Sequence, residues 1–303
     1  MRFCSPRSWA EALELKAERP DAMPIMGGTD VMVEVNAGRL RPDLLLDLTG
    51  VADLRSWSVT EPPDLADGGA GSPPVVQLSA GVTYTRVIDE LSAVLPGLAA
   101  AGRTVGSPQI RNRATVAGNV ATASPAGDGL VPLVASRAVV EVASVHGSRR
   151  VPVADFMTAP KRTVLRPDEL VAAVLVPTRT GPQKFAKIGS RNAMVISVTG
   201  FAVELRAARQ EVGTGIGSAA ATVRPATAAE DFAAAELDWA GRGPVNEETL
   251  REFGELVAVA ADPIDDIRGS AAYRRHALAV VARRALGWAW CEYRAAEPES
   301  GSA

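Results

Sequence analysis

The chain has 303 residues, of which 47% are hydrophobic and 22% are charged, and its formal net charge is −3. This length accommodates about two domains, each large enough to bury a core. No uninterrupted apolar run approaches the roughly 20 residues that a membrane-spanning helix needs, so no membrane span is expected. The 32 basic residues are scattered among 35 acidic ones, which argues against a nucleic-acid-binding surface. The first residues lack the pattern of a secretion signal, so a cytoplasmic location is expected.

The residues that bind metals are few. Cys4 and Cys291 are the two cysteines, and they cannot supply the four thiolates that an iron–sulfur cluster usually takes. His146 and His276 lie far apart and near neither cysteine, so a zinc site is not expected either. A P-loop, a Gly-x-Ser-x-Gly motif, an HExxH motif and a paired CxxC are also missing. Redox chemistry in this chain would therefore use an organic cofactor, and no metal ligand or catalytic side chain is assigned.

The first fifty residues predict a helix, a strand, a glycine turn, a second helix and a second strand. Ser8 and Glu11 form a capping box that opens the first helix, because each side chain can accept from the free backbone N–H group of the other residue. The continuous apolar run DLLLDL is typical of a buried strand. The helices are expected at 8–18 and 31–38, the strands at 24–26 and 43–48, and the turn at 27–30.

The middle of the chain predicts alternating helices and strands. The polar stretch 61–74, rich in proline and glycine, lies between the strand-like runs SWSV and VVQLSAGV and predicts a hairpin with a long mobile loop. Helices are expected at 84–94, 96–103 and 130–137, and strands at 139–144, 149–156 and 168–177, with a turn at 146–148.

Pro177 marks a domain boundary. Beyond it, three strand-like runs, KFAKIG, VISVTGFAVEL and EVGTGIGSAAATV, alternate as in one sheet, and helical patterns follow at 248–261 and 271–292. Strands followed by helices indicate an α+β unit.

A first candidate ligand site is the turn Gly27-Gly28-Thr29-Asp30, which follows an apolar run and precedes a helix. Paired glycines let the backbone approach a ligand closely, and N–H groups at the start of a helix suit a phosphate. An ordinary strand-to-helix turn, with Thr29 or Asp30 as the N-cap, is the alternative.

A second candidate is TVAGNVATASPAGD, residues 115–128. Gly118 permits close backbone approach, Asn119 donates through its amide, and the Thr115 and Thr122 hydroxyls suit phosphate oxygens. Asp128 is the one carboxylate of the run, and such a group commonly accepts ribose hydroxyls. A loop held by its own side-chain hydrogen bonds is the alternative.

A third stretch, GTGIGSA at 213–219, does not fit a dinucleotide fingerprint, because Ser218 stands where the third glycine is needed. A flexible strand or hairpin is expected there. Arg111 and Arg113 are candidates for phosphate contact or for solvated surface positions, and the sequence leaves both open.

Three blocks, MGGTDVMVEVNAGRLRPDLLLDL, TVGSPQIRNRATVAGNVATASPAGDG and DDIRGSAAYRRHAL, resemble the FAD-binding medium subunit of the molybdenum hydroxylases, the family of xanthine dehydrogenase and the aerobic carbon monoxide dehydrogenases. The resemblance runs from about residue 3 to 290 and implies an FAD-dependent oxidoreductase subunit. It also implies an α+β fold: a two-lobed FAD-binding domain of the vanillyl-alcohol-oxidase type, then a smaller α+β domain with a three-stranded antiparallel sheet and helices. The domains are expected at 1–176, with lobes about 1–55 and 56–176, and at 177–292, before a disordered tail at 293–303.

The resemblance also implies the residues of the cofactor site. The FAD pyrophosphate would lie between two glycine turns, while Asp128 would bind the adenosine ribose, Lys187 would lie near the flavin ring and Val171 would contact the adenine side. Lys187 as a solvated strand residue and Val171 as a core residue remain alternatives. The residues carried over for the two turns are Met26, Gly27, Gly28, Thr29 and Asp30, and then Thr115, Gly118, Asn119 and Thr122.

Three positions depart from the family pattern. Ala114 and Ala117 stand where the family often has glycine, and a methyl group at 117 would restrict a positive φ. FAD binding is nevertheless expected to survive, because alanine is small. Gly129 replaces a frequent serine, with an effect that the sequence does not define.

The functional implication of the resemblance is electron transfer. A molybdopterin-binding large subunit would oxidise the substrate, a small subunit with two [2Fe–2S] centres would carry the electrons, and noncovalent FAD on this chain would pass them to NAD⁺ or another acceptor. A stand-alone flavin oxidoreductase of the same fold and an interaction subunit that has lost its flavin are the alternatives. A Rossmann-type dehydrogenase is not expected, because Ser218 stands where its fingerprint needs the third glycine.

Overall fold

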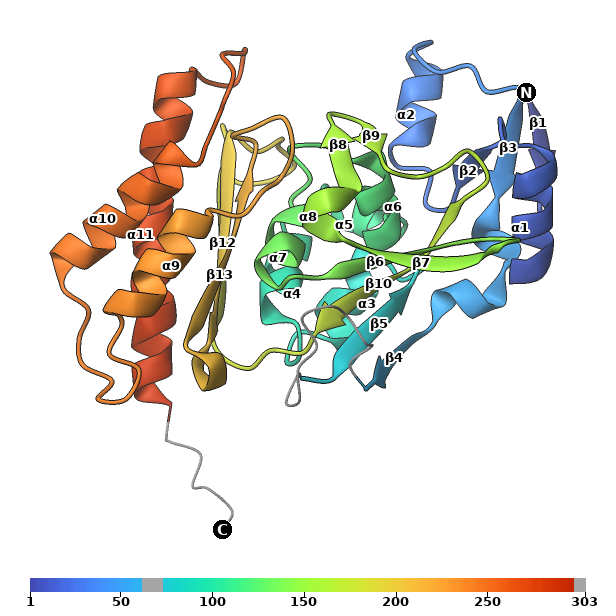
Figure 1. Cartoon of the computed structure of the whole chain (residues 1–303). Helices are drawn as coiled ribbons and strands as arrows, with labels where there is room; N and C mark the ends of the chain where they lie inside the picture. Colours follow the sequence, from blue (N-terminus) through green and yellow to red (C-terminus); the bar gives the residue numbers. More distant parts are fainter. Residues whose placement is uncertain (62–72, 297–303) are drawn as a thin grey trace.

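The computed structural model describes residues 1–61 and 73–296. Figure 1 shows three layers of structure along the molecule: a small N-terminal lobe, a central lobe around a five-stranded sheet, and a C-terminal sheet covered by helices. The C-terminal strands lie between their own helices and the helices of the central lobe.

The N-terminal lobe is a parallel sheet with the order β1-β3-β2. Its strands are β1 (Arg2–Cys4), β2 (Met23–Ile25) and β3 (Leu44–Asp47), linked by α1 (Trp9–Glu18) and α2 (Val31–Asn36). The predicted capping box is confirmed in one half: the Ser8 hydroxyl accepts from the Glu11 N–H at 3.2 Å, whereas the Glu11 carboxylate accepts at 2.7 Å from the N–H of Arg7 instead of Ser8. The buried run in β3 forms the middle strand, as its continuous apolar character predicted.

The central lobe is built on an antiparallel sheet with the order β4-β5-β10-β6-β7. The expected hairpin is confirmed by the pairing of β4 with β5, while most of its predicted loop lies outside the described residues. The strands are β4 (Trp57–Thr60), β5 (Val75–Ser79), β6 (Val139–Ser144), β7 (Gly147–Pro152) and β10 (Leu170–Pro177), with a small ribbon of β8 (Met157–Ala159) and β9 (Arg162–Thr163). The helices are α3 (Tyr84–Glu90), α4 (Pro96–Gly102), α5 (Pro108–Arg111), α6 (Val116–Thr122), α7 (Leu130–Ala135) and α8 (Val153–Phe156).

Several predicted boundaries in this lobe are wrong. The turn expected at 146–148 is shorter, because β7 begins at Gly147, and the helix expected at 130–137 ends at Ala135. Residues 149–156 were expected as one strand, but β7 ends at Pro152 and α8 follows, because proline has no N–H group to continue the ladder. The helix expected at 84–94 ends at Glu90, four residues early.

The C-terminal domain confirms the expected three-stranded antiparallel sheet with helices. Its strands are β11 (Gln183–Ile188), β12 (Thr199–Arg206) and β13 (Glu211–Gly217), in that order, and its helices are α9 (Thr227–Glu236), α10 (Glu247–Val259) and α11 (Ala271–Ala295). The sequence did not predict α9. Helix α11 continues to Ala295, past the start expected for the tail, and residues 297–303 lie outside the described part of the chain.

Glycines on one face of β13 allow helix α7 of the central lobe to pack directly against the C-terminal sheet. A Cβ atom at Gly215 would lie 2.0 Å from the Val131 carbonyl oxygen, and one at Gly213 would lie 2.2 Å from the Ala135 carbonyl oxygen. Strand alternation places both glycines on the same face. The stretch GTGIG is therefore a strand, as predicted, and its glycines permit the contact between the domains.

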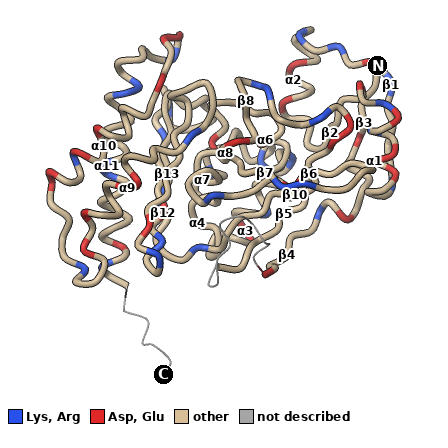
Figure 2. Tube along the Cα trace, in the orientation of Figure 1, with Lys and Arg blue, Asp and Glu red and all other residues tan. Residues whose placement is uncertain are grey.

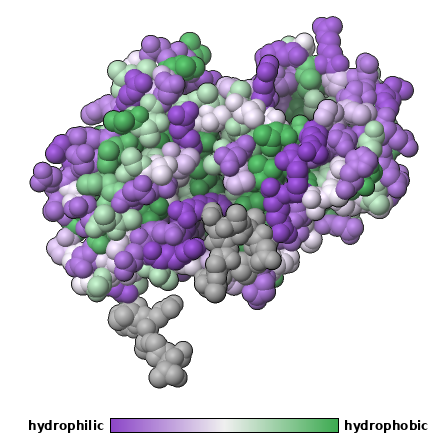
Figure 3. All heavy atoms as spheres, viewed as in Figure 1, coloured by the Kyte–Doolittle hydropathy of each residue, from purple (hydrophilic) through white to green (hydrophobic). Residues whose placement is uncertain are grey.

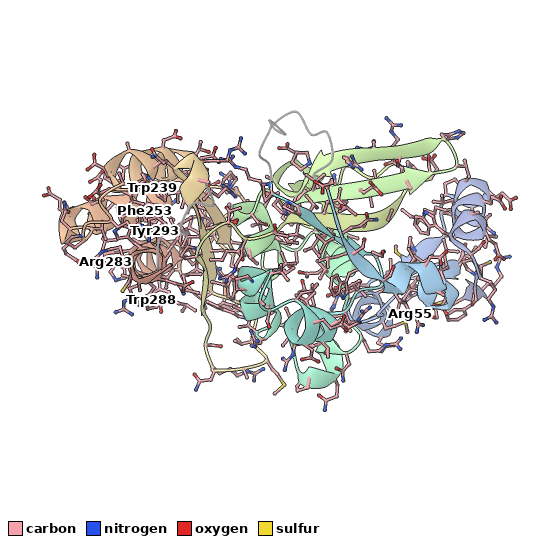
Figure 4. All side chains as sticks on the ribbon, turned by 90° about the horizontal axis from the view of Figure 1, so that it is seen from below. Arg55, Trp239, Phe253, Arg283, Trp288 and Tyr293 are labelled. Carbon is pink, nitrogen blue, oxygen red and sulfur yellow. The ribbon has the colours of Figure 1, made fainter. Side chains whose placement is uncertain are left out.

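Each domain has its own hydrophobic core. In the C-terminal domain the core is rich in aromatic rings: Trp239 and Trp290 meet edge to face at 5.4 Å, and Phe201 and Phe253 at 6.2 Å. Figure 4 shows Trp239, Phe253 and Tyr293 gathered among the C-terminal helices.

The surface carries both charge signs, interspersed along the trace in Figure 2. Polar and apolar residues are likewise mixed on the face shown in Figure 3. Within residues 1–61 and 73–296, no helix combines the length and the apolar character needed to cross a membrane.

Candidate functional site

The two glycine-containing segments lie directly against each other. A Cβ atom on Gly27 would lie 2.1 Å from the Arg113 carbonyl oxygen, so only glycine fits between the first turn and the residues that lead into the second segment. The Thr122 hydroxyl lies 3.2 Å from a carboxylate oxygen of Asp30, so this hydrogen bond is a second contact between the two segments. Gly28 has a φ of +74°, a left-handed conformation that favours glycine.

The first turn presents free main-chain donors. The N–H groups of Gly27, Gly28, Thr29 and Asp30 donate no hydrogen bond to any residue of the described chain. Asp30 is the N-cap of α2, but its side chain makes no capping bond and accepts from Thr122 instead. Half-exposed N–H groups without protein partners suit the oxygens of an anionic ligand such as a diphosphate.

The second segment differs from the expected turn, because most of it is the short helix α6. The Thr115 hydroxyl is its N-cap and accepts from the Gly118 N–H at 2.9 Å, which leaves Gly118 exposed at the surface of the first turn of the helix. Ala117 lies inside α6 and has an ordinary helical conformation, so the strain considered for a methyl group at this position does not arise.

Asp128 and Lys187 form an ion pair that joins the two domains. The Lys187 ammonium lies 2.5 Å from the Asp128 carboxylate, and both side chains are about nine-tenths buried. The Thr104 hydroxyl donates to the same carboxylate oxygen at 2.9 Å. Burial raises the pKa of Asp128, while Lys187, Thr104 and Ser197 oppose that rise.

This contact excludes the picture of Lys187 as a solvated strand residue. The two residues thus contact each other directly, and their expected roles at the adenosine ribose and near the flavin ring stay predictions.

Val171 belongs to the hydrophobic core of the central lobe, and Met26 packs against that core. Val171 is 8% exposed and belongs to the core of the central lobe, next to an irregularity in the pairing of β10 with β6. Val171 is thus part of the core, and its contact with the adenine side stays a prediction. Met26 packs on that core, where its terminal methyl group would lie 3.0 Å from a Cβ atom on Gly81.

Several residues that support the site were not found from the sequence. Tyr84, on α3, donates from its hydroxyl to the Asn119 side-chain oxygen at 2.8 Å. Ser197 pairs with Ser218 at 2.6 Å between their hydroxyl oxygens, next to Asp128. These residues lie far from the two segments in sequence and belong to no motif, so only the fold brings them to the site.

A cavity of about 710 Å³ opens beside the Asp128–Lys187 pair. It is strongly basic, because Arg103, Arg111, Lys187 and Arg191 line it, and no carboxylate is found among its lining residues in the part of the chain that the structure describes. Arg111 donates to the carbonyl oxygens of Arg103, Val105 and Gly106, so this guanidinium also fixes the wall of the cavity.

The fold is of the α+β class, and comparison with known proteins identifies its family. Residues 1–179 match the family described as the FAD binding domain in molybdopterin dehydrogenase, and residues 184–289 match the CO dehydrogenase flavoprotein C-terminal domain. The chain therefore belongs to the family of FAD-binding medium subunits of the molybdopterin dehydrogenases.

Among curated proteins, the chain is 29% identical to the putative xanthine dehydrogenase FAD-binding subunit XdhB of Escherichia coli K12, covering 91% of each chain. It is 28% identical to the nicotine 6-hydroxylase medium subunit of Paenarthrobacter nicotinovorans, covering 94% of this chain and 96% of the other. A chain of the carbon monoxide dehydrogenase structure from Hydrogenophaga pseudoflava superposes with a TM-score of 0.84 at 24% identity, covering 97% and 98% of the two chains. This structural likeness confirms the predicted fold.

The described residues fit the cofactor that the family implies. FAD has a diphosphate between two sugar-like groups, and the site offers unpaired N–H groups beside a buried carboxylate and ammonium. Gly27 and Gly28 are the two positions where a side chain would clash or strain the turn that presents these N–H groups.

Proposed function

We propose that this chain is the FAD-carrying electron-transfer subunit of a molybdenum hydroxylase complex. In this proposal its partners are a molybdopterin-binding large subunit and a small subunit with [2Fe–2S] centres, and its acceptor is NAD⁺ or another oxidant. The observation that carries the proposal is the convergence of the two segments on one set of free main-chain donors. The names of the relatives, a xanthine dehydrogenase subunit and a nicotine 6-hydroxylase subunit, support the same role.

The chain's own residues would bind and orient the cofactor. The N–H groups of 27–30 and the Asn119 amide would hold the diphosphate. Thr115 would cap α6 through the Gly118 N–H, and Gly118, which has no side chain, would let the diphosphate approach the backbone. The Asp128 carboxylate would accept hydroxyls of the cofactor, and Lys187 would keep that carboxylate in place. Val171 would support the adenine side from the core. FAD, when bound, takes up electrons singly and releases them in pairs.

The two domains have different parts in this proposal. We assign cofactor binding to 1–176 and completion of the site to 177–292, because Lys187 and Ser197 come from the second domain. Noncovalent attachment is proposed, since both cysteines and both histidines lie outside the two segments.

The basic cavity favours an anionic acceptor. Lys187 is paired with Asp128, but Arg103, Arg111 and Arg191, with no carboxylate among the described lining residues, suit the diphosphate of NAD⁺ better than a neutral quinone. NAD⁺ is therefore the acceptor that the electrostatics of this chain support best.

The test is reconstitution of the chain with its two partner subunits. Reduction of the complex by its substrate under anaerobic conditions should bleach the flavin absorbance, and NAD⁺ should restore it faster than a neutral quinone. Turnover by the chain alone would instead establish a stand-alone flavin oxidoreductase. Assembly without any flavin would establish an interaction subunit.

A further inference from the structure

Tyr84 is the largest polar side chain buried beside the candidate site. It has no exposed surface, and its hydroxyl lies 2.8 Å from the side-chain oxygen of Asn119 in α6. Burial, with the nearby Asp128 and Asp30 carboxylates, raises the pKa of Tyr84, so the phenol keeps its proton at all working pH values. A neutral phenol facing a carbonyl oxygen must act as the donor.

This hydrogen bond fixes the orientation of the Asn119 amide. Because Oδ1 accepts from Tyr84, the amide nitrogen is turned away from the tyrosine. It lies 3.2 Å from the position of a Cβ atom on Gly127, and it donates to no residue within the described chain. Gly127 has no side chain to fill this space, so the amide N–H groups remain available to a ligand.

The position of the Tyr84 hydroxyl also explains why residue 129 is a glycine. A Cβ atom at this position would lie 1.9 Å from the Tyr84 oxygen and 2.8 Å from the ring carbon that carries it. Serine at 129 is therefore incompatible with Tyr84 as placed. In this chain a tyrosine from α3 occupies the room in which a side chain at 129 would lie.

We propose that Tyr84 is a positioning residue for FAD, which holds the Asn119 amide with its N–H groups directed at the cofactor diphosphate. The inference rests on the proposed function, because it takes FAD as the ligand of the two segments. It adds a residue outside both segments and gives it a defined chemical task.

The test uses the full-length chain, with FAD affinity measured by quenching of flavin fluorescence. Tyr84→Phe keeps the buried ring and removes only the hydroxyl, and we expect the dissociation constant to rise about tenfold. The matched control is Tyr293→Phe, which removes a hydroxyl that donates to the Trp239 carbonyl at 3.3 Å in the C-terminal helices, far from the site (Figure 4). This control should bind FAD as the unmodified chain does.

A double-variant cycle separates positioning from general support of the fold. In an Asn119→Ala background, Tyr84→Phe should cause no further loss of affinity, because the amide that it orients is gone. An equal tenfold loss in both backgrounds would overturn the inference, and so would unchanged affinity in Tyr84→Phe alone.

Asn119→Asp provides an independent check. The carboxylate still accepts from Tyr84, so the thermal midpoint of the cofactor-free chain should be retained, while FAD binding falls because the donor is lost and a negative charge faces the diphosphate. If neither Asn119→Ala nor Asn119→Asp changes FAD affinity, the placement of FAD at the two segments is itself wrong. If both weaken binding and Tyr84→Phe does not, the inference alone fails.

Discussion

At the residue scale, the Asp128–Lys187 pair shows how burial and charge act together. The carboxylate is removed from water, which costs free energy when it is ionised, and an ammonium at 2.5 Å returns only part of that cost. If Asp128 binds cofactor hydroxyls as proposed, the cost has a function, because an ionised carboxylate is the stronger acceptor.

The raised pKa of Asp128 predicts how its effect on stability depends on pH. The folded state holds the proton more tightly than the unfolded state, so between the usual value of 3.8 and the folded pKa the unfolding free energy falls as pH rises. Within that window the slope approaches about 1.4 kcal/mol per pH unit.

Urea unfolding of the cofactor-free chain checks this point. Relative to Asp128→Asn, which cannot ionise, the unmodified chain should lose stability as pH rises from about 4 towards neutral. If the difference in unfolding free energy between the two chains stays constant as pH rises, or grows in favour of the unmodified chain, the attraction of Lys187 outweighs the burial of Asp128.

At the scale of elements, the glycines of β13 decide how the domains meet. Gly215→Ala should destabilise the chain by about 3 kcal/mol, because the new methyl group would lie 2.0 Å from the backbone of α7 and neither element can yield easily. Gly287→Ala is the matched control: it lies in α11, its new methyl group would contact only Leu250 at 3.6 Å, and a small stabilisation is expected there. Thermal unfolding measures both, and equal effects would contradict the packing account.

The sequence patterns predicted the helices and strands better than they predicted the tertiary contacts. Ser8 with Glu11 fixed the start of α1, and the apolar run at Leu44 fixed a buried strand, because these signals are local. The end of α3 and the whole of α9 were missed, because tertiary packing outweighs weak local preferences, whereas the end of β7 was missed although Pro152 marks it locally. The resemblance supplied the segments of the site, whereas the partnership of Tyr84 with Asn119 joins residues 35 positions apart and carries no local signal.

At the scale of the whole molecule, the C-terminal domain is hydrogen-bonded to the candidate site. The buried Arg274 guanidinium, on α11, donates to the carbonyl oxygens of Val198 at 2.6 Å and Ser218 at 2.7 Å, and pairs with Asp266. Ser218 in turn donates from its N–H to the Pro125 carbonyl of the second segment at 2.8 Å. The helices at one end of the molecule are thus connected to the cofactor site through a continuous set of hydrogen bonds.

Removing this guanidinium should affect both stability and cofactor binding. Arg274→Met leaves the Val198 and Ser218 carbonyls without this donor and leaves Asp266 with Arg268 as its one arginine partner among the described residues. We expect a loss of about 3–5 kcal/mol in unfolding free energy and weaker FAD binding. Arg268→Met is the matched control, because Arg268 pairs with the same Asp266 from an exposed position. Its loss should cost less than about 1 kcal/mol and leave FAD binding intact. Equal losses in the two variants would argue against a connection to the site.

The measurement that tests the central claim most directly is a structure of the chain with bound FAD. The account predicts the cofactor diphosphate within hydrogen-bond distance of the main-chain N–H groups of 27–30 and of the Asn119 amide. A diphosphate bound elsewhere on the chain, with those N–H groups facing solvent, would contradict it.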